Sequence, residues 1–176
     1  PSKIPHAVPL SNSGDWALFA PLYGGQGSII SWSKFGGTPS DDLSGEIVWI
    51  KPAVPLSNLY PAGFSFSTRA HGSRFQPAAK ALRFNNGQLT LSGGALESQI
   101  VNQISIDAQN RVTNLSSNKL SLKFSPATGL FSGKVMDPIS SMLIPFKGAL
   151  LQKDDVAFGW FPGQNGLSGE VILSGQ

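Results

Sequence analysis

The sequence contains no cysteine and only two histidines, His6 and His71. Without thiols the chain can form neither disulfide bonds nor thiolate metal sites. Two histidines are also too few for a histidine-based metal centre. We therefore expect neither a metal ion nor a cofactor in this protein.

Charged residues are also scarce, at 13% of the chain, and the formal net charge is only +3. The lysines and arginines are scattered singly, whereas nucleic-acid binding usually requires them in clusters. No apolar run is long enough to cross a bilayer, and no signal peptide is recognisable. We expect no nucleic-acid partner and no membrane insertion. The first residue is Pro1 rather than methionine, which fits a processed chain or a piece of a larger protein.

Glycine and proline are plentiful, with 20 and 13 residues, which is typical of short strands joined by tight turns. Several segments, such as residues 64–71 and 120–124, alternate apolar and polar side chains with the period of two that marks a strand. No segment has a helical apolar stripe of useful length. About eleven to thirteen short strands in sequential hairpins favour an all-β fold, an antiparallel meander barrel or barrel-like sandwich.

A three-strand pattern occurs twice, in residues 16–49 and in residues 144–173. Aligning the two copies places Trp32 on Trp160, and Leu43-Ser-Gly-Glu46 on Leu167-Ser-Gly-Glu170. We interpret residues 1–176 as one domain with two pseudo-repeated halves, residues 1–92 and 95–176, that meet at Gly93-Gly94. Two tandem subdomains are the alternative.

Three of the four tryptophans, Trp16, Trp32 and Trp160, fall on the strand face shared with leucine and isoleucine. The alternation therefore predicts that they belong to the core, where a tryptophan contributes a large apolar area. Trp49 has the same parity but lies at a strand end. Replacing Trp32 or Trp160 by alanine is accordingly predicted to cost about 3–5 kcal/mol of stability.

The candidate ligand-binding residues are aromatic side chains that lie in loops or on the strand face opposite the leucine and isoleucine residues. Two polar residues complete the set. Flat aromatic rings stack on sugar rings, and arginine or histidine can hydrogen-bond to hydroxyl groups. We expect two or three of the aromatic residues to be exposed together, close to one of the polar ones. The candidates are Phe19, Tyr23, Phe35, Tyr60, Arg69 and His71.

The acidic residues suggest structure more than catalysis. Glu46 and Glu170 occupy matching places in the repeat and could act as acid and base in sugar hydrolysis, but their alternation favours solvated charges on a polar face. The pairs Asp41-Asp42 and Asp154-Asp155 are interpreted as turn residues, with calcium binding as the alternative. His71 as a base would need a serine or aspartate neighbour. No catalytic residue is predicted.

Several short sequence motifs, including Phe158-Gly-Trp-Phe161 and Leu167-Ser-Gly-Glu-Val171, resemble a β-rich repeat of very large, uncharacterised secreted or surface proteins of bacteria. Residues 16–23, residues 27–32 and Trp49-Ile-Lys-Pro52 resemble its companion unit. Together they cover about half of the chain. These motifs consist of turn glycines and core aromatics, so the resemblance assigns no catalytic residue to this chain. The resemblance implies an exported module, extracellular or on the cell surface, accompanied by the flanking domains of a larger chain.

These observations favour a non-catalytic extracellular binding module with polysaccharide as its ligand. A purely structural repeat domain of a large surface or secreted protein is the alternative, and a small-ligand-binding β-barrel is the third reading. An enzyme ranks last, because no nucleophile, metal site or acid/base set stands out.

Overall fold

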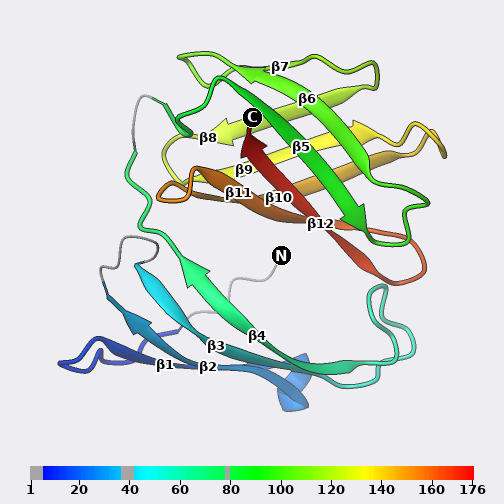
Figure 1. The fold of residues 1–176 in the computed structure, drawn as a ribbon. Helices are drawn as coiled ribbons and strands as arrows, with labels where there is room; N and C mark the ends of the chain where they lie inside the picture. The colour runs from blue at the N-terminus through cyan, green and yellow to red at the C-terminus, as the bar shows by residue number, and fades with distance from the viewer. Residues whose placement is uncertain (1–5, 37–41, 78–79) are drawn as a thin grey trace. The chain divides into compact units, whose positions relative to one another are not determined.

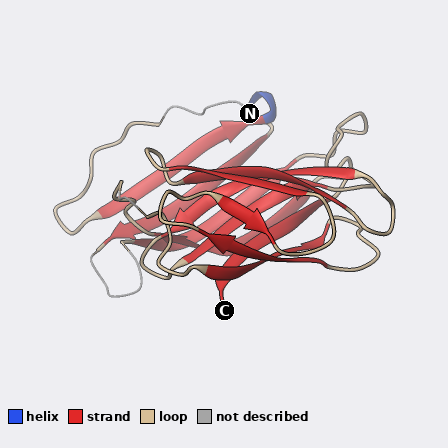
Figure 2. Ribbon diagram, turned by 90° about the horizontal axis from the view of Figure 1, so that it is seen from above, coloured by secondary structure: helices blue, strands red, loops and turns tan. Residues whose placement is uncertain are grey.

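The computed structural model describes residues 6–36, 42–77 and 80–176. Within these residues the chain forms twelve β-strands and one short 3-10 turn (Figures 1 and 2). The predicted all-β, barrel-like antiparallel fold is thereby confirmed. The chain divides into two compact units, which we call the N-terminal unit (Pro1–Ser73) and the C-terminal unit (Arg74–Gln176). That the two units form a single domain stays a prediction.

The N-terminal unit is one four-stranded sheet with the strands in sequence order. Its first hairpin turns through the 3-10 segment η1 (Tyr23–Gly25), where Gly24 and Gly25 have φ values of 68° and 87°. Glycine adopts this left-handed region without steric cost. The strands are β1 (Asp15–Leu22), β2 (Gly27–Phe35), β3 (Leu43–Lys51) and β4 (Phe64–Gly72).

The C-terminal unit is an eight-stranded sheet in the order β7-β6-β5-β12-β11-β10-β9-β8. Its strands are β5 (Asn86–Gly93), β6 (Ile100–Ile106), β7 (Val112–Asn114), β8 (Leu120–Ser125), β9 (Leu130–Met136), β10 (Leu143–Leu151), β11 (Val156–Pro162) and β12 (Ser168–Gly175). Two meanders are joined because β12 pairs with β5, and the sheet curls until it is nearly closed (Figure 1). Gly93, the predicted seam, pairs with Gly169 inside this sheet, and the units divide after Ser73 instead.

Three phenylalanine rings fill the inside of the C-terminal unit, each lying against a strand glycine. A Cβ atom on any of these glycines would lie between 2.1 and 2.5 Å from the facing ring, a distance that real side chains do not tolerate. The rings therefore pack directly on the backbone, where glycine lets a sheet bend sharply. The pairs are Phe146 with Gly133, Phe131 with Gly148, and Phe161 with Gly169.

Asn102 of β6 is a polar residue in this interior, with 0% of its side chain exposed. Its Nδ2 donates to Asn114 Oδ1 at 3.0 Å, and its Oδ1 accepts from Asn118 Nδ2 at 3.1 Å. Asn114 ends β7, and Asn118 lies in the loop to β8. Buried amides of this kind are normally satisfied. Asn102 thus fastens the loop that joins the two edge strands to the inside of the sheet.

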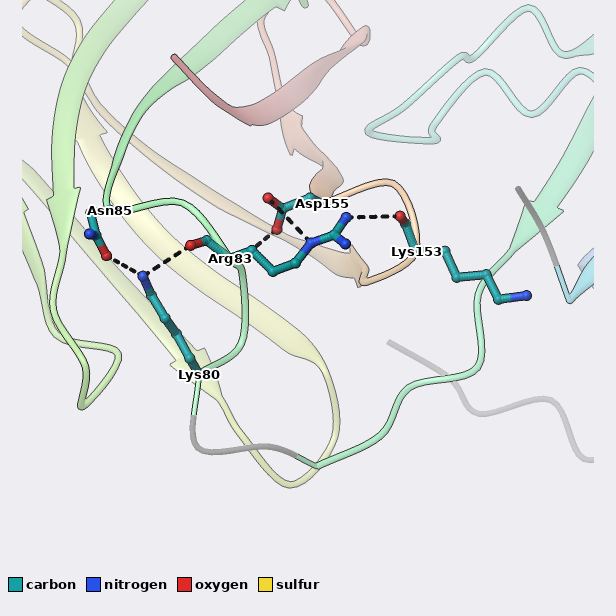
Figure 3. Close-up of polar contacts among 5 residues, drawn as sticks. All are labelled: Lys80, Arg83, Asn85, Lys153 and Asp155. Carbon is teal, nitrogen blue, oxygen red and sulfur yellow. Dashed lines mark hydrogen bonds and ion pairs between the residues drawn. The ribbon is translucent and has the colours of Figure 1, made fainter. Parts of the chain in front are cut away.

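A polar latch holds the segment before β5 against the β10–β11 turn (Figure 3). The backbone N–H of Arg83 donates to Asp155 Oδ1 at 2.6 Å, and its guanidinium donates to the Lys153 carbonyl at 3.2 Å. Lys80 donates to the Arg83 carbonyl at 3.3 Å and also to the Asn85 side chain. Asp155 is therefore a structural turn residue, and the latch keeps the neighbouring Leu82 in the core.

Candidate functional site

The second and third strands of the predicted repeat share one pattern of pairing and hydrogen bonding in both units. In each copy the tryptophan lies directly opposite the glutamate of the next strand, and a serine of the strand beyond donates a hydrogen bond to that glutamate. The sets are Trp32, Glu46 and Ser67 in the N-terminal unit, and Trp160, Glu170 and Ser92 in the C-terminal unit.

Both tryptophans of the repeat lie on the surface, so the prediction that they belong to the core was wrong. Trp32 is 70% exposed and Trp160 is 40% exposed. The β1–β2 hairpin pairs Trp32 with Ala17, which places Trp32 on the face opposite Trp16 because side chains alternate along a strand. In β11 the inward position belongs to Phe161, the residue after Trp160.

For the same reason Trp32 was not among the candidate residues predicted from the sequence. The alternation in β2 suggests that Ile30 and Trp32 point inward, yet Ser31 and Ser33 are the buried residues. Their hydroxyl groups lie 2.7 Å apart and share a hydrogen bond. The signal that could have placed Trp32 on the surface was the occurrence of both a tryptophan and a glutamate in each copy, since a glutamate beside the tryptophan indicates a solvated face.

Trp32 belongs to a mixed apolar and charged surface on one side of the four-stranded sheet, which we call the Trp32 face. Apolar side chains from three strands lie next to each other there, because Phe19 is opposite Ile30 and Ile30 is opposite Val48. Phe19 is 57% exposed. Hydrogen-bonding groups adjoin this strip. The face consists of Phe19, Ile30, Trp32, Glu46, Val48, Ser67 and Arg69.

Three of the predicted ligand-binding residues lie on this side of the sheet. Phe19 belongs to the apolar strip, and Arg69 lies opposite Glu46 in the same row as Trp32. His71 lies opposite Ser44, one row further along β4. The sheet therefore brings Phe19, Arg69 and His71 to one face, with Trp32 as an aromatic residue that was not among the candidates.

The other three predicted aromatic residues lie elsewhere. The Phe35 ring packs on the opposite face, with its centroid 5.8 Å from that of Trp16. The Tyr60 ring meets Phe64 edge-on at 5.2 Å, and Tyr23 lies in the β1–β2 turn. The four aromatic residues do not gather into one patch.

Tyr23 and Tyr60 are instead connected to Lys51, a lysine with only 7% of its surface exposed. Its Nζ donates to the Tyr60 carbonyl at 3.0 Å and lies 5.3 Å from the centroid of the Tyr23 ring. A cation over an aromatic face is attracted by the ring quadrupole. This arrangement gives both tyrosines a structural role in fixing the chain around Lys51.

Three carboxylates have pKa values below their ordinary range, each because of hydrogen bonds within its own turn. A carboxylate held in this way stays ionised near neutral pH and is a poor general acid. The main cause of the lowered pKa is a hydrogen bond from the Ser140 hydroxyl for Asp137, from the Arg111 backbone N–H for Asp107, and from the Ser13 hydroxyl for Asp15.

The remaining acidic candidates are Glu46, Glu170 and the pair Asp41-Asp42. Glu46 and Glu170 belong to different units, and each accepts from a serine. Asp41 lies outside the described residues. Among the residues described, no group of three or more histidine or acidic side chains is placed to hold a metal ion.

Comparison with family models, with curated proteins and with solved structures gave no significant match. In residues 6–36, 42–77 and 80–176 there is no helix whose length and apolar character would let it span a membrane.

Replacing Trp32 by alanine is expected to change the free energy of unfolding by less than about 1 kcal/mol, because most of its side chain is already in contact with water. Chemical denaturation followed by circular dichroism measures this value. A loss in the range of about 3–5 kcal/mol, typical of a buried aromatic residue, would contradict the surface position of Trp32.

Proposed function

We propose that this protein is a non-catalytic binding module for polysaccharide and that the Trp32 face is its binding surface. The observation that carries the proposal is the 70% exposure of Trp32 beside the exposed Phe19 ring and Ile30. A large aromatic residue left in water loses the burial that usually stabilises it. Neighbouring exposed apolar residues of this kind mark interaction surfaces.

The chemistry of the Trp32 face suits a sugar ring. Trp32 and Phe19 provide flat apolar surface, and aromatic rings with polar groups at their edges are the side chains that such sites use. Glu46 can accept hydrogen bonds from hydroxyl groups, and Arg69 can donate them. Both charges lie in the row of Trp32, so one ligand can contact the ring and the polar groups together.

The two other readings have less support from the surfaces described. In the C-terminal unit the inward side chains of Phe161, Leu89 and Leu173 are fully buried, so the described interior of the sheet gives a small-ligand barrel little support. A purely structural repeat gives no reason for keeping Trp32 in water. An extracellular or cell-surface location belongs to the same proposal and is supported by the resemblance to bacterial repeat proteins.

Affinity electrophoresis of the whole chain in gels that contain single polysaccharides tests this function. Wild-type protein is expected to be retarded by at least one neutral glycan, with a dissociation constant in the millimolar to micromolar range, roughly 4–8 kcal/mol. Trp32→Ala is expected to weaken binding about tenfold or more, because an aromatic anchor typically contributes about 2 kcal/mol.

The matched control is Leu56→Ala, which removes an apolar side chain that is 96% exposed in the same unit but lies outside the Trp32 face. It is expected to bind like the wild type. If no glycan retards the wild type, or if Trp32→Ala and Leu56→Ala bind equally well, the Trp32 face is not a sugar site and the structural-repeat reading replaces it.

A further inference from the structure

Lysines that are scattered in the sequence gather on the outer surface of the C-terminal unit. Lys123 of β8 and Lys147 of β10 both lie opposite Ser132 of β9, and Lys147 lies opposite Trp160 of β11. These residues form one row across four neighbouring strands. Lys134 lies on the same side of β9, opposite Ser121 and Pro145.

This row runs between two adjoining surface depressions of about 520 and 590 Å³. Both depressions are lined by Lys123, Ser132, Lys147 and Trp160. Lys134 borders the first and Phe158 the second. We call this surface, from Lys123 to Trp160 with Lys134 and Phe158, the lysine face.

The lysine face carries an excess of positive charge that nothing within its strands neutralises. Strands β8 to β11 contain three lysines and, by sequence, no aspartate or glutamate. The acidic side chain at its edge is Glu170 of β12, opposite Trp160, which accepts a hydrogen bond from Ser92 at 2.8 Å. The field above the depressions therefore attracts anions.

Aromatic rings lie in the same surface as the charges. Trp160 and Phe158 are two residues apart on β11, so both point outward, and they are 40% and 48% exposed. Lys147 Nζ lies 5.0 Å from the centroid of the Trp160 ring, close enough for a cation–π interaction. That contact holds the ammonium group and the ring side by side.

We propose that the lysine face is a second binding site, one that takes an acidic polysaccharide carrying carboxylate or sulfate groups. Lys123 and Lys147 are two strands apart, about 10 Å, which suits a polymer with repeated charges better than a single small anion. Trp160 and Phe158 offer the flat surface for its sugar rings. The proposal is independent of the Trp32 face, because its residues all belong to the C-terminal unit.

A nucleic acid fits this surface less well, although it is also a polyanion. The lysine face contains no arginine, and arginine is the residue whose planar fork matches phosphate in a bidentate fashion. Lysine acts as a compact point charge that pairs equally with a carboxylate or a sulfate. An oligonucleotide is therefore a control ligand in the test.

The experiment is affinity electrophoresis of the whole chain with polygalacturonate (carboxylate), dextran sulfate (sulfate), uncharged dextran and a single-stranded oligonucleotide. The wild type is expected to bind one or both acidic polysaccharides and to lose binding as salt screens the charges. Lys123→Gln is expected to weaken binding about two- to fivefold, as for one exposed ion pair. Trp160→Ala is expected to weaken it as well.

Two control variants separate this site from the Trp32 face and from general charge effects. Lys34→Gln removes the same charge from β2 of the N-terminal unit, and Trp32→Ala removes the other tryptophan. Both are expected to bind acidic polysaccharide like the wild type. The proposal is overturned if no acidic polysaccharide binds, if Lys34→Gln weakens binding as much as Lys123→Gln, or if the oligonucleotide binds equally well and Trp160→Ala changes nothing. Loss of acidic-polysaccharide binding in Trp32→Ala alone would assign that ligand to the Trp32 face instead.

Discussion

Replacing Phe161 by alanine is expected to destabilise the C-terminal unit by about 3–5 kcal/mol. The Phe161 side chain is 0% exposed, and its ring lies against two glycines, Gly94 and Gly169. Because glycine has no side chain, these two residues cannot fill the space that the ring leaves. The expected loss of stability therefore combines the lost transfer free energy of the ring atoms with the cost of the cavity that remains.

The matched variant is Trp160→Ala, one residue earlier on the same strand. It removes a larger ring from the outer surface and is expected to cost about 1 kcal/mol or less, since a surface side chain contributes little. Urea denaturation of both variants, monitored by far-ultraviolet circular dichroism, compares them directly. Equal losses, or a larger loss for Trp160→Ala, would mean that the inner and outer faces of β11 are exchanged.

Replacing Gly148 by alanine is the second change with a large expected effect. The new Cβ atom would lie 2.1 Å from the Phe158 carbonyl oxygen and 2.5 Å from the Gly159 Cα atom. Both are backbone atoms of the paired strand β11, so no side-chain rotation relieves the contact. Strands β10 and β11 must separate, and we expect a loss of about 2–3 kcal/mol or more.

Gly36→Ala is the control for this substitution, because no atom lies within 4 Å of a Cβ placed there and its backbone angle is not in the left-handed region. Its effect on the free energy of unfolding is expected to stay within about 0.5 kcal/mol. Thermal and urea unfolding measure both variants. A Gly148→Ala protein as stable as Gly36→Ala would show that β10 and β11 do not approach each other this closely at the Gly148–Gly159 pair.

The strands could be predicted from the sequence, but the side of the sheet on which each residue lies could not. Turn glycines and period-two alternation are local signals, whereas the Trp32–Glu46 and Trp160–Glu170 pairs were not predicted, because the alternation placed each tryptophan and its glutamate on opposite faces. The face of a strand depends on the register of its hairpin, and a shift of one residue moves every side chain to the other side. That is why Trp32 was assigned to the core.

The proposed binding surfaces depend on the same long-range information. Lys123, Lys134 and Lys147 are separated by more than ten residues each in the sequence, and only the pairing of β8, β9 and β10 brings them together. Phe19 and Arg69 come from the first and last strands of one sheet. The sequence therefore suggested dispersed charge where the pairing of β8, β9 and β10 brings three lysines to one face.

The repeated meander has different interiors in the two units. The residue after the tryptophan points inward over a glycine in both copies, yet it is Ser33 over Gly45 in one and Phe161 over Gly169 in the other. The outward tryptophan and glutamate are unchanged between an open sheet and a nearly closed one. Under the proposed function, selection on ligand binding acts on the outer residues while selection on stability acts on the inner ones. A designer could likewise transfer the outward pattern to another antiparallel sheet and leave that sheet's own core in place.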